Sequence, residues 1–292
     1  MTPTTQTTAA EIRSQDAALL LSRRINKVLW WTTAVLVAFL LVGPFIIMVL
    51  ASFQRSKAYF TSPWDWLPSE PTLLNYEILF SRSKVIRWTL NSLLISTVPV
   101  FISVSMSLML GYIFARKRFF GKEVVFWLFL SSLMIPFQVT LAPLYLMMNA
   151  IDWIDTYWVL MVPGMVQVTG MFLMRQFMET IPASLEEAAE LDGCNPWQVI
   201  LHVIAPLAKT AIATLVTLGF IGAWNGFLFP LIFTVSESMR PLTVGLATFA
   251  DTTGSFGLNM AAATINFLPT FAIYLYFQRY FVKGIALGGM KL

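Results

Sequence analysis

Six long stretches without a charged residue dominate this chain of 292 residues. They cover residues 28–54, 88–115, 124–151, 156–174, 210–236 and 252–278. A helix needs about 20 apolar residues to cross the roughly 30 Å of hydrocarbon in a bilayer. The six stretches therefore predict an all-α membrane protein with six transmembrane helices. They leave room for short loops and for no separate soluble domain.

Composition supports this fold class and excludes several functions. Hydrophobic residues make up 57% of the chain and charged residues 12%, about half the usual share for a soluble domain. A single cysteine, Cys194, and a single histidine, His202, exclude an internal disulfide and a Cys- or His-based metal site. No basic face alternates with aromatic residues, so we expect no nucleic-acid partner. We also expect no metal and no cofactor.

The basic residues predict the orientation of the chain in the membrane. Thirteen of the nineteen Lys and Arg residues lie in the segments 1–27, 116–123, 175–209 and 279–292. Basic residues accumulate on the cytoplasmic side, so this distribution places both termini in the cytoplasm. Residues 1–27 are expected to form a cytoplasmic lead, loose over 1–20, and residues 28–292 to form one transmembrane domain. Residues 238–259, between the last two spans, should then lie outside, partly tucked into the outer mouth.

The spans contain no carboxylate, lysine, arginine or histidine. Secondary transporters and proton pumps usually need such groups, so their absence argues against these classes. The polar groups that remain include five amides, which either line a path for solute or bond a neighbouring helix: Asn91, Gln138, Gln167, Asn225 and Asn266. Asn225 and Asn266 with Trp224 are the preferred path residues, because an aromatic ring beside an amide suits a sugar.

The segment Ile181–Pro206, which we call the elbow, is polar and acidic between two apolar spans. Ser184 and Glu187 have the spacing of a capping box, and Gly193 suits the position after a helix end. Asn195 with Pro196 predicts the start of a second helix. The pattern therefore predicts two short helices with a glycine joint on one face of the membrane. The acids and caps alone are explained by a stable surface helix; such a charged, rigid segment also suits docking of another protein.

No nucleotide-binding loop of the type GxxxxGK[ST] is present, since Gly121-Lys122 is followed by Glu123 and lacks the upstream glycine. If transport is driven by ATP, the ATPase is therefore a separate chain.

The elbow carries a family resemblance. Glu187-Ala188-Ala189, Asp192-Gly193 and Pro206 resemble the EAA signature of the inner-membrane permease subunits of bacterial ABC importers. The segments that agree with the carbohydrate-uptake branch of this family are Asn91-Ser92, Gly111-Tyr112, Ala115 to Gly121, Gln176-Phe177, Trp224-Asn225 and Gln278 to Gly289. The chain resembles the smaller permease of the maltose type, with a family core at about 88–282. Cys194 departs from the small residue that commonly follows the glycine.

The resemblance implies an assembly and a role for the elbow. Its helix between spans four and five would be the coupling helix, with Glu187, Ala188, Ala189, Asp192 and Gly193 meeting the ATPase. The implied partners are a second permease of the same fold, two copies of a cytoplasmic ATPase and an extracytoplasmic solute-binding protein. The chain itself would be no enzyme, and would form half of the path of a sugar importer in the bacterial inner membrane.

Other functions remain open from the sequence. An ABC permease for glycerol phosphate, a polyamine or an acidic oligosaccharide such as alginate would differ only in path residues and in the binding protein. An ATP-independent channel or carrier and an intramembrane enzyme are disfavoured, since no ion-coupling or nucleophile–base group is found.

Overall fold

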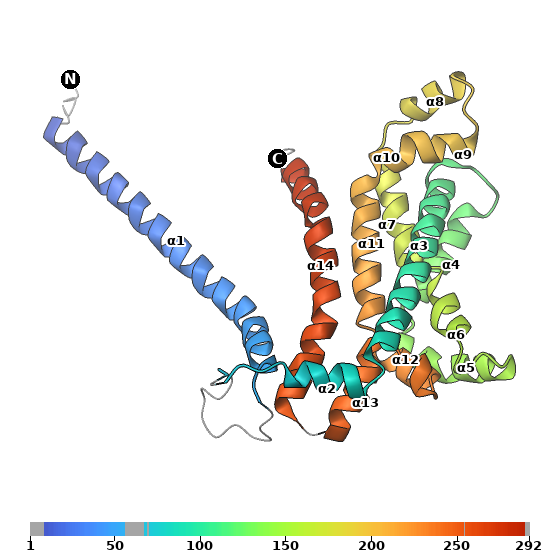
Figure 1. Cartoon of the computed structure of the whole chain (residues 1–292). Helices are drawn as coiled ribbons and strands as arrows, with labels where there is room; N and C mark the ends of the chain where they lie inside the picture. Colours follow the sequence, from blue (N-terminus) through green and yellow to red (C-terminus); the bar gives the residue numbers. More distant parts are fainter. Residues whose placement is uncertain (1–8, 56–66, 69, 254, 290–292) are drawn as a thin grey trace.

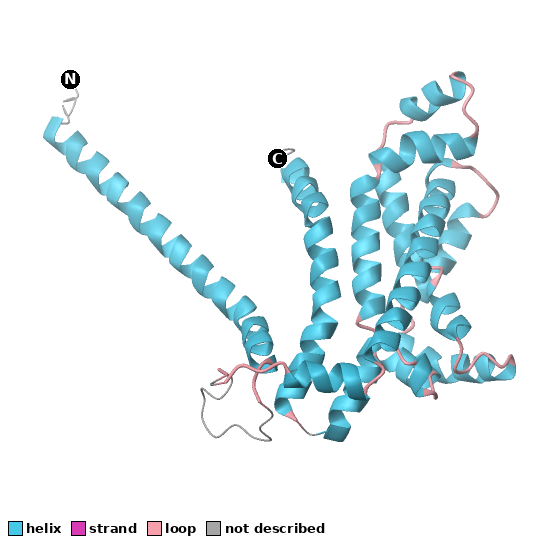
Figure 2. Ribbon diagram, viewed as in Figure 1, coloured by secondary structure: helices cyan, strands magenta, loops and turns pink. Residues whose placement is uncertain are grey.

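The protein is all-helical in a computed structural model that describes residues 9–55, 67–68, 70–253 and 255–289. Figure 1 shows several long helices running side by side, a long N-terminal helix that leans away from them, and shorter helices across both ends. Figure 2 shows that the connections between them are loops, and the described residues contain no strand. This confirms the predicted all-α class.

Four helices in the described part of the chain are long and apolar enough to cross a membrane alone. They are Ser22–Ser52 of α1 (Ala9–Ser52), α3 (Val85–Arg116), Tyr157–Glu179, and Phe256–Arg279 of α14 (Phe256–Gly289). The third comprises α6 (Tyr157–Met161), the 3-10 turn η1 (Val162–Gly164) and α7 (Val168–Glu179). Pro163 lies in η1, because a proline lacks the N–H that continues an α-helix.

Two helix pairs qualify as spans only if each is counted as one bent unit. The helices α4 (Lys122–Ser132) and α5 (Phe137–Ala150) meet at 96°. The segment Pro196–Leu207 meets α11 (Lys209–Trp224) at 81°.

One bend agrees with the prolines of the sequence, and two features differ from the sequence predictions. The stretch 124–151 bends by 96° at Pro136, the N-cap of α5, because a proline disfavours the helical region in the residue before it. The stretch 210–236 leaves the α-helix at Asn225-Gly226, a turn-forming pair, before α12 (Leu228–Phe233). The expected loose lead is helical from Ala9, because its Ala, Leu, Glu and Arg residues favour helix and extend α1. Residues 1–8 lie outside the described residues.

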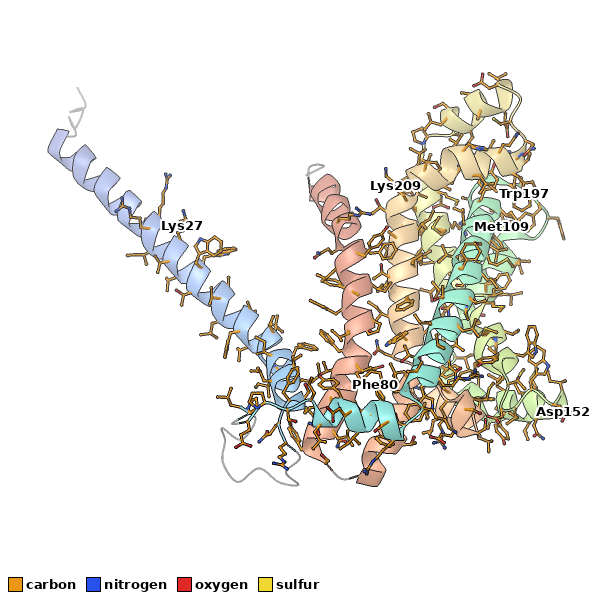
Figure 3. All side chains as sticks on the ribbon, viewed as in Figure 1. Lys27, Phe80, Met109, Asp152, Trp197 and Lys209 are labelled. Carbon is orange, nitrogen blue, oxygen red and sulfur yellow. The ribbon has the colours of Figure 1, made fainter. Side chains whose placement is uncertain are left out.

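The elbow and the remaining short helices lie at opposite ends of the molecule. The elbow contains α8 (Ser184–Leu191), α9 (Pro196–Gln198), the π-helical turn η2 (Val199–Ile204) and the first residues of α10 (Ala205–Leu207). The other end holds α2 (Leu74–Arg82), α12, the turn η3 (Glu237–Met239) and α13 (Leu242–Thr253) (Figure 1). Figure 3 places Lys27, Trp197 and Lys209 toward the elbow, and Phe80 and Asp152 toward the opposite end.

The central contact of the fold is the close crossing of α3 and α7, which two glycines allow. A Cβ at Gly111 of α3 would lie 2.6 Å from the Met174 Cβ of α7. A Cβ at Gly170 of α7 would lie 2.3 Å from the Ser107 Oγ of α3. Lipid tails are as apolar as side chains, so helices in a membrane gain most of their attraction from such close packing.

At the end opposite the elbow, side chains of α3 hold the segment that leads into α13. The Trp88 Nε1 donates to Glu237 O, and the Asn91 Nδ2 donates to Ser238 O and Arg240 O. The Ser92 Oγ accepts the Leu242 N–H. These distances are 2.8–2.9 Å. The segment expected to be tucked into this end is thus a packed helix, whose Gly245 lies against the Trp88 ring.

Asp155 fastens the turn before α6 to the loop after α12. It has a left-handed φ of 60°, and its Oδ1 accepts the N–H groups of Val235 and Ser236 at 2.9 and 3.0 Å. Partial burial acts to raise the pKa of Asp155, but the hydrogen bonds from Ser236 and Val235 and the nearby Arg240 outweigh it and lower the pKa.

We expect Gly111→Ala to destabilise the protein, because the new methyl group would force α3 and α7 apart. The loss should be about 1–3 kcal/mol, measured as thermal unfolding in detergent. Gly43→Ala is the matched control, since a Cβ on that helical glycine meets no atom within 4 Å. Equal stability of the two variants would contradict the close crossing.

We expect Asp155→Ala to lower stability by about 1.5–3 kcal/mol through loss of charge-assisted hydrogen bonds. Because the folded pKa is lowered, the carboxylate stabilises the protein above the unfolded pKa, and this contribution disappears as the pH falls through the folded pKa. Asp155→Asn keeps an acceptor and tolerates the left-handed backbone, so it should lose less at neutral pH. The stabilities of wild type and Asp155→Asn, measured by thermal unfolding, should therefore differ less near pH 3 than at pH 7. A constant difference between them would refute the assignment.

Candidate functional site

The first helix of the elbow, α8, has a C-terminal end fixed by backbone hydrogen bonds. The N–H of Gly193 donates to Glu190 O and that of Cys194 to Ala189 O, at 3.0 and 2.9 Å. Gly193 has a left-handed φ of 87°, which confirms the predicted glycine joint. At the start of the same helix, however, Ala183 is the cap and no side chain bonds the helix end, so the predicted capping box of Ser184 and Glu187 is not formed.

The second half of the elbow follows its prediction. The Asn195 Oδ1 accepts the Gln198 N–H at 2.9 Å, and the Gln198 Oε1 accepts the Asn195 N–H at 2.8 Å. This reciprocal pair is a capping box, with Pro196 at the first helical position. The elbow is therefore rigid on both sides of its glycine joint.

The predicted coupling residues divide between two faces of α8. Glu187, Ala188 and Asp192 are exposed, whereas Ala189 is buried in an apolar cluster that includes residues of α3, α7 and η2. The two alanines therefore do not form one outward face, because successive residues of a helix point about 100° apart. Leu191 and Trp197 extend the outward surface with large exposed apolar groups.

A buried ion pair, which the sequence reading missed, attaches the elbow to the end of α3. The Arg116 Nε donates to the Glu186 Oε1 at 2.5 Å, and its Nη2 donates to Ile181 O at 2.5 Å. Around the pair, an apolar cluster joins the elbow to α3, α7 and the start of α11: Leu108, Tyr112, Met174, Met178, Ile181, Ala189, Val199, Ile200, Ile204 and Ala208.

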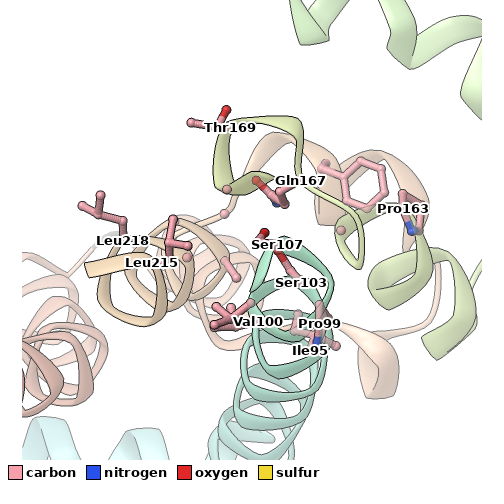
Figure 4. A pocket seen from close by; sticks show the side chains of 18 of the residues that line it. Ile95, Pro99, Val100, Ser103, Ser107, Pro163, Gln167, Thr169, Leu215 and Leu218 are labelled. Atoms are coloured by element: carbon pink, nitrogen blue, oxygen red, sulfur yellow. The ribbon is translucent and has the colours of Figure 1, made fainter. Parts of the chain in front are cut away.

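A cavity of about 560 Å³ lies between α3, α11 and the chain from α6 to α7. Its wall is mainly apolar, with residues such as Val100, Leu160 and Leu215. Four polar side chains also line it: Ser103, Ser107, Gln167 and Thr169. Figure 4 shows Ser103 and Ser107 on α3, with Gln167 and Thr169 on the neighbouring segment.

These four side chains differ in exposure: Gln167 and Thr169 are exposed, whereas Ser103 and Ser107 are 8% and 2% exposed, with the Ser107 Oγ lying against Gly170 of α7. None of the four side chains makes a hydrogen bond with another described residue, and none of the described residues that line the cavity is charged. Ser103 and Ser107 are one helical turn apart and so point to the same side of α3. For Gln167, the sequence left two roles open, lining a solute path or bonding a neighbouring helix, and its place in the cavity wall favours the first. The two serines were missed, although their four-residue spacing in an apolar span was a usable signal.

The preferred path residues lie elsewhere, between α11 and α14. Trp224 is 1% exposed, stacks on Phe220 and donates from Nε1 to Asn266 O at 3.0 Å. The Asn225 Nδ2 donates to Ile221 O at 2.9 Å and reaches the Thr270 Oγ1 at 3.4 Å. None of the three lines the cavity, whereas the neighbouring Ala223 and Gly226 do. A buried ring that packs in the core cannot stack on a solute in this conformation.

Comparison with known proteins decides the family. Residues 107–287, more than half of the chain, match the family described as "Binding-protein-dependent transport system inner membrane component". This range includes the elbow and much of the cavity wall.

The chain belongs to this family.

Its relatives are permeases of named transport systems. The arabinooligosaccharides transport system permease protein AraQ of Halalkalibacterium halodurans is 31% identical over 278 residues, covering 93% of this chain and 100% of AraQ. The sn-glycerol-3-phosphate transport system permease protein UgpE of Rhizobium meliloti is 31% identical over 256 residues, covering 84% and 91%. The expected likeness to ABC permeases for carbohydrate uptake is confirmed.

A solved structure shows the same fold. It is the crystal structure of a bacterial ABC transporter involved in the import of the acidic polysaccharide alginate, with a TM-score of 0.77 and 24% identity. The similarity covers 89% of this permease and 98% of that chain. Apolar helices, family and fold together make this a multi-pass membrane transport subunit, which is not itself catalytic.

Proposed function

We propose that this permease forms half of the translocation path of an ATP-driven, binding-protein-dependent importer of uncharged oligosaccharides. The observation that carries the proposal is a cavity whose hydroxyl and amide side chains bond no described residue and whose described lining includes no charged residue. Sugar hydroxyl groups both donate and accept hydrogen bonds, and so match serine and glutamine side chains. The apolar part of the wall suits the C–H faces of sugar rings.

The uncharged cavity favours neutral sugars over the solutes of some relatives. UgpE is named for glycerol phosphate, and the transporter of known structure imports an acidic polysaccharide. An anion that leaves water needs a positive or strongly donating partner. The described residues of the cavity wall offer neutral donors and no charged group, as expected for the type of solute in the name of AraQ.

The elbow is the proposed docking site for the ATPase. Glu187, Ala188 and Asp192 offer an exposed, rigid and acidic surface, and Gly193 sets the angle between its two helices. The buried Ala189 would act indirectly, by letting α8 lie close to the bundle. Two ATPase copies would serve this permease and a second permease of the same fold, which would complete the path.

The topology that fits this role has six spans, with each bent pair counted once, and the elbow in the cytoplasm. The N-terminal end of α1 and the C-terminal end of α14 lie on the same side of the molecule as the elbow (Figure 1). Both termini would therefore be cytoplasmic. The end with α2 and α13 would then face outward, where a solute-binding protein delivers its cargo. The second solved relative, with a TM-score of 0.58, is described as a complex with an alginate-bound periplasmic protein.

Asn225 and Asn266 remain proposed path residues of a different conformation. The Oδ1 of Asn266 is buried without a partner in the described residues, an arrangement that a shift between α11 and α14 would relieve. Trp224 would join them only if its packing against Phe220 opened.

The substrate class is tested by uptake into vesicles that contain the complete complex and its binding protein. The probes are a neutral arabino-oligosaccharide, an oligo-alginate and sn-glycerol 3-phosphate. We expect ATP-dependent uptake of the neutral probe. Uptake without ATP would refute the importer, and preference for an anionic probe would refute the neutral class.

We expect Gln167→Leu to reduce uptake of the neutral probe about 2- to 10-fold, the equivalent of one lost hydrogen bond of about 0.5–1.5 kcal/mol. Assembly and basal ATP hydrolysis should be unchanged, because the side chain of Gln167 bonds no described residue. Gln138→Leu is the matched control: the same change in an exposed amide that does not line the cavity. Equal uptake per complex by both variants would remove Gln167 from the path.

We expect Gly193→Pro to abolish coupling, since proline fixes φ near −65° and cannot adopt the left-handed turn. Gly193→Asn should couple almost normally, because asparagine tolerates this backbone and a Cβ here meets no atom within 4 Å. Glu187→Ala should weaken ATPase co-purification, without loss of insertion, since the side chain of Glu187 bonds no described residue. Normal co-purification and uptake in both Gly193→Pro and Glu187→Ala would refute the docking assignment.

A further inference from the structure

The cavity-lining helix α3 ends in a polar contact with the elbow. Arg116 is the last residue of α3, and its guanidinium binds both the Glu186 carboxylate and the Ile181 carbonyl. The side chains of Arg116 and Glu186 are only 17% and 10% exposed. One arginine therefore joins the end of α3, the exit of α7 and the first turn of α8.

Both charges also suit the helix ends at which they lie. Arg116 is at the C-terminus of α3, where the helix dipole favours a cation, and Glu186 is in the first turn of α8, where it favours an anion. The planar guanidinium reaches two acceptors in fixed directions, which a lysine ammonium at the end of a flexible chain does not reproduce.

Among the described residues, these are the hydrogen bonds at bonding distance between α3 and the elbow. The remaining contact is largely apolar, through Leu108 and the Tyr112 ring, although the Tyr112 hydroxyl also interacts electrostatically with Glu186. Apolar contacts have little directional preference, so one surface can slide over another at low cost. The buried, charge-assisted bonds of Arg116 are directional and fix the register of the elbow on α3.

From Arg116, α3 runs without a proline to the cavity. Ser107 and Ser103 lie about 14 and 20 Å from it along the helix. Pro99, which also lines the cavity, is the first proline in this direction. It interrupts the backbone hydrogen bonds, so bending of α3 is least costly there.

We propose that Arg116 is a positioning residue that locks the elbow to the inner half of α3, so that both move as one body when the ATPase changes conformation. Ser103 and Ser107 then shift with the elbow, and the cavity changes shape in step with ATP binding. This inference rests on the proposed function, in which the elbow is the part that the ATPase moves.

Distances between spin labels in the assembled complex test the lock. In a Cys194→Ser background, one label replaces Glu190 on the exposed side of α8 and a second replaces the exposed Phe101 on α3. Pulsed electron paramagnetic resonance gives the distance distribution without nucleotide and with ATP. A reference pair at Glu190 and Leu275, on α14, reports whether the elbow moves relative to the outer helices.

With Arg116 intact, we expect the Glu190–Phe101 distribution to stay the same with and without ATP, while the reference distance shifts. Arg116→Gln with Glu186→Gln leaves no unpaired buried charge, so it should fold even if Arg116→Gln alone does not. In this double variant the Glu190–Phe101 distribution should shift with ATP or broaden at least twofold. Arg116→Lys should fall between it and wild type.

Glu179→Gln is the matched control. It removes the same kind of carboxylate from an arginine pair, with Arg175 at 3.0 Å, but lies on α7 and is not part of the elbow. This variant should behave as wild type. A double variant whose Glu190–Phe101 distance stays fixed would overturn the lock, as would a wild type whose distance changes with ATP. A wild type in which the reference pair ignores ATP overturns the proposed function, and the lock with it.

Discussion

The close crossing of α3 and α7 supports both functional parts of this permease. Gly111 and Gly170 remove the side chains that would keep the two helices apart. The crossing forms the wall of the cavity at Ser107. Close to it, Leu108 and Tyr112 of α3 and Met174 and Met178 of α7 belong to the apolar cluster in which the elbow packs. Without a hydrophobic driving force between helices in lipid, this steric fit is the main source of their attraction.

Helix α3 connects the two ends of the molecule. Near its start, Trp88, Asn91 and Ser92 hold the segment before α13, and at its last residue Arg116 holds the elbow. The cavity lies between these two anchored ends. In the proposed mechanism, a movement imposed at one end would reach the cavity-lining hydroxyl groups of Ser103 and Ser107 through this one helix.

Polar groups inside the spans have distinct roles that a list of amides does not separate. The Asn91 Nδ2 donates to two backbone carbonyls and its Oδ1 accepts the Tyr157 hydroxyl, so both polar atoms of this amide are paired within the protein. The side-chain amide of Gln167, by contrast, makes no hydrogen bond with a described residue and lines the cavity. The difference follows from the cost of an unpaired polar group in an apolar medium: it is either paired by the fold or kept accessible to water and solute.

The sequence by itself determined the all-helical membrane class, the glycine joint at Gly193, the cap at Asn195 and the family, because each depends on local composition or on short-range spacing. Only the tertiary structure decided how sharply the stretch 124–151 bends, that Trp224 packs in the core, and that Ser103 and Ser107 line a cavity. It also decided the pairing of Arg116 with Glu186. These features depend on which helix faces lie opposite each other, and residues 70 positions apart in the chain carry no local signal of their contact.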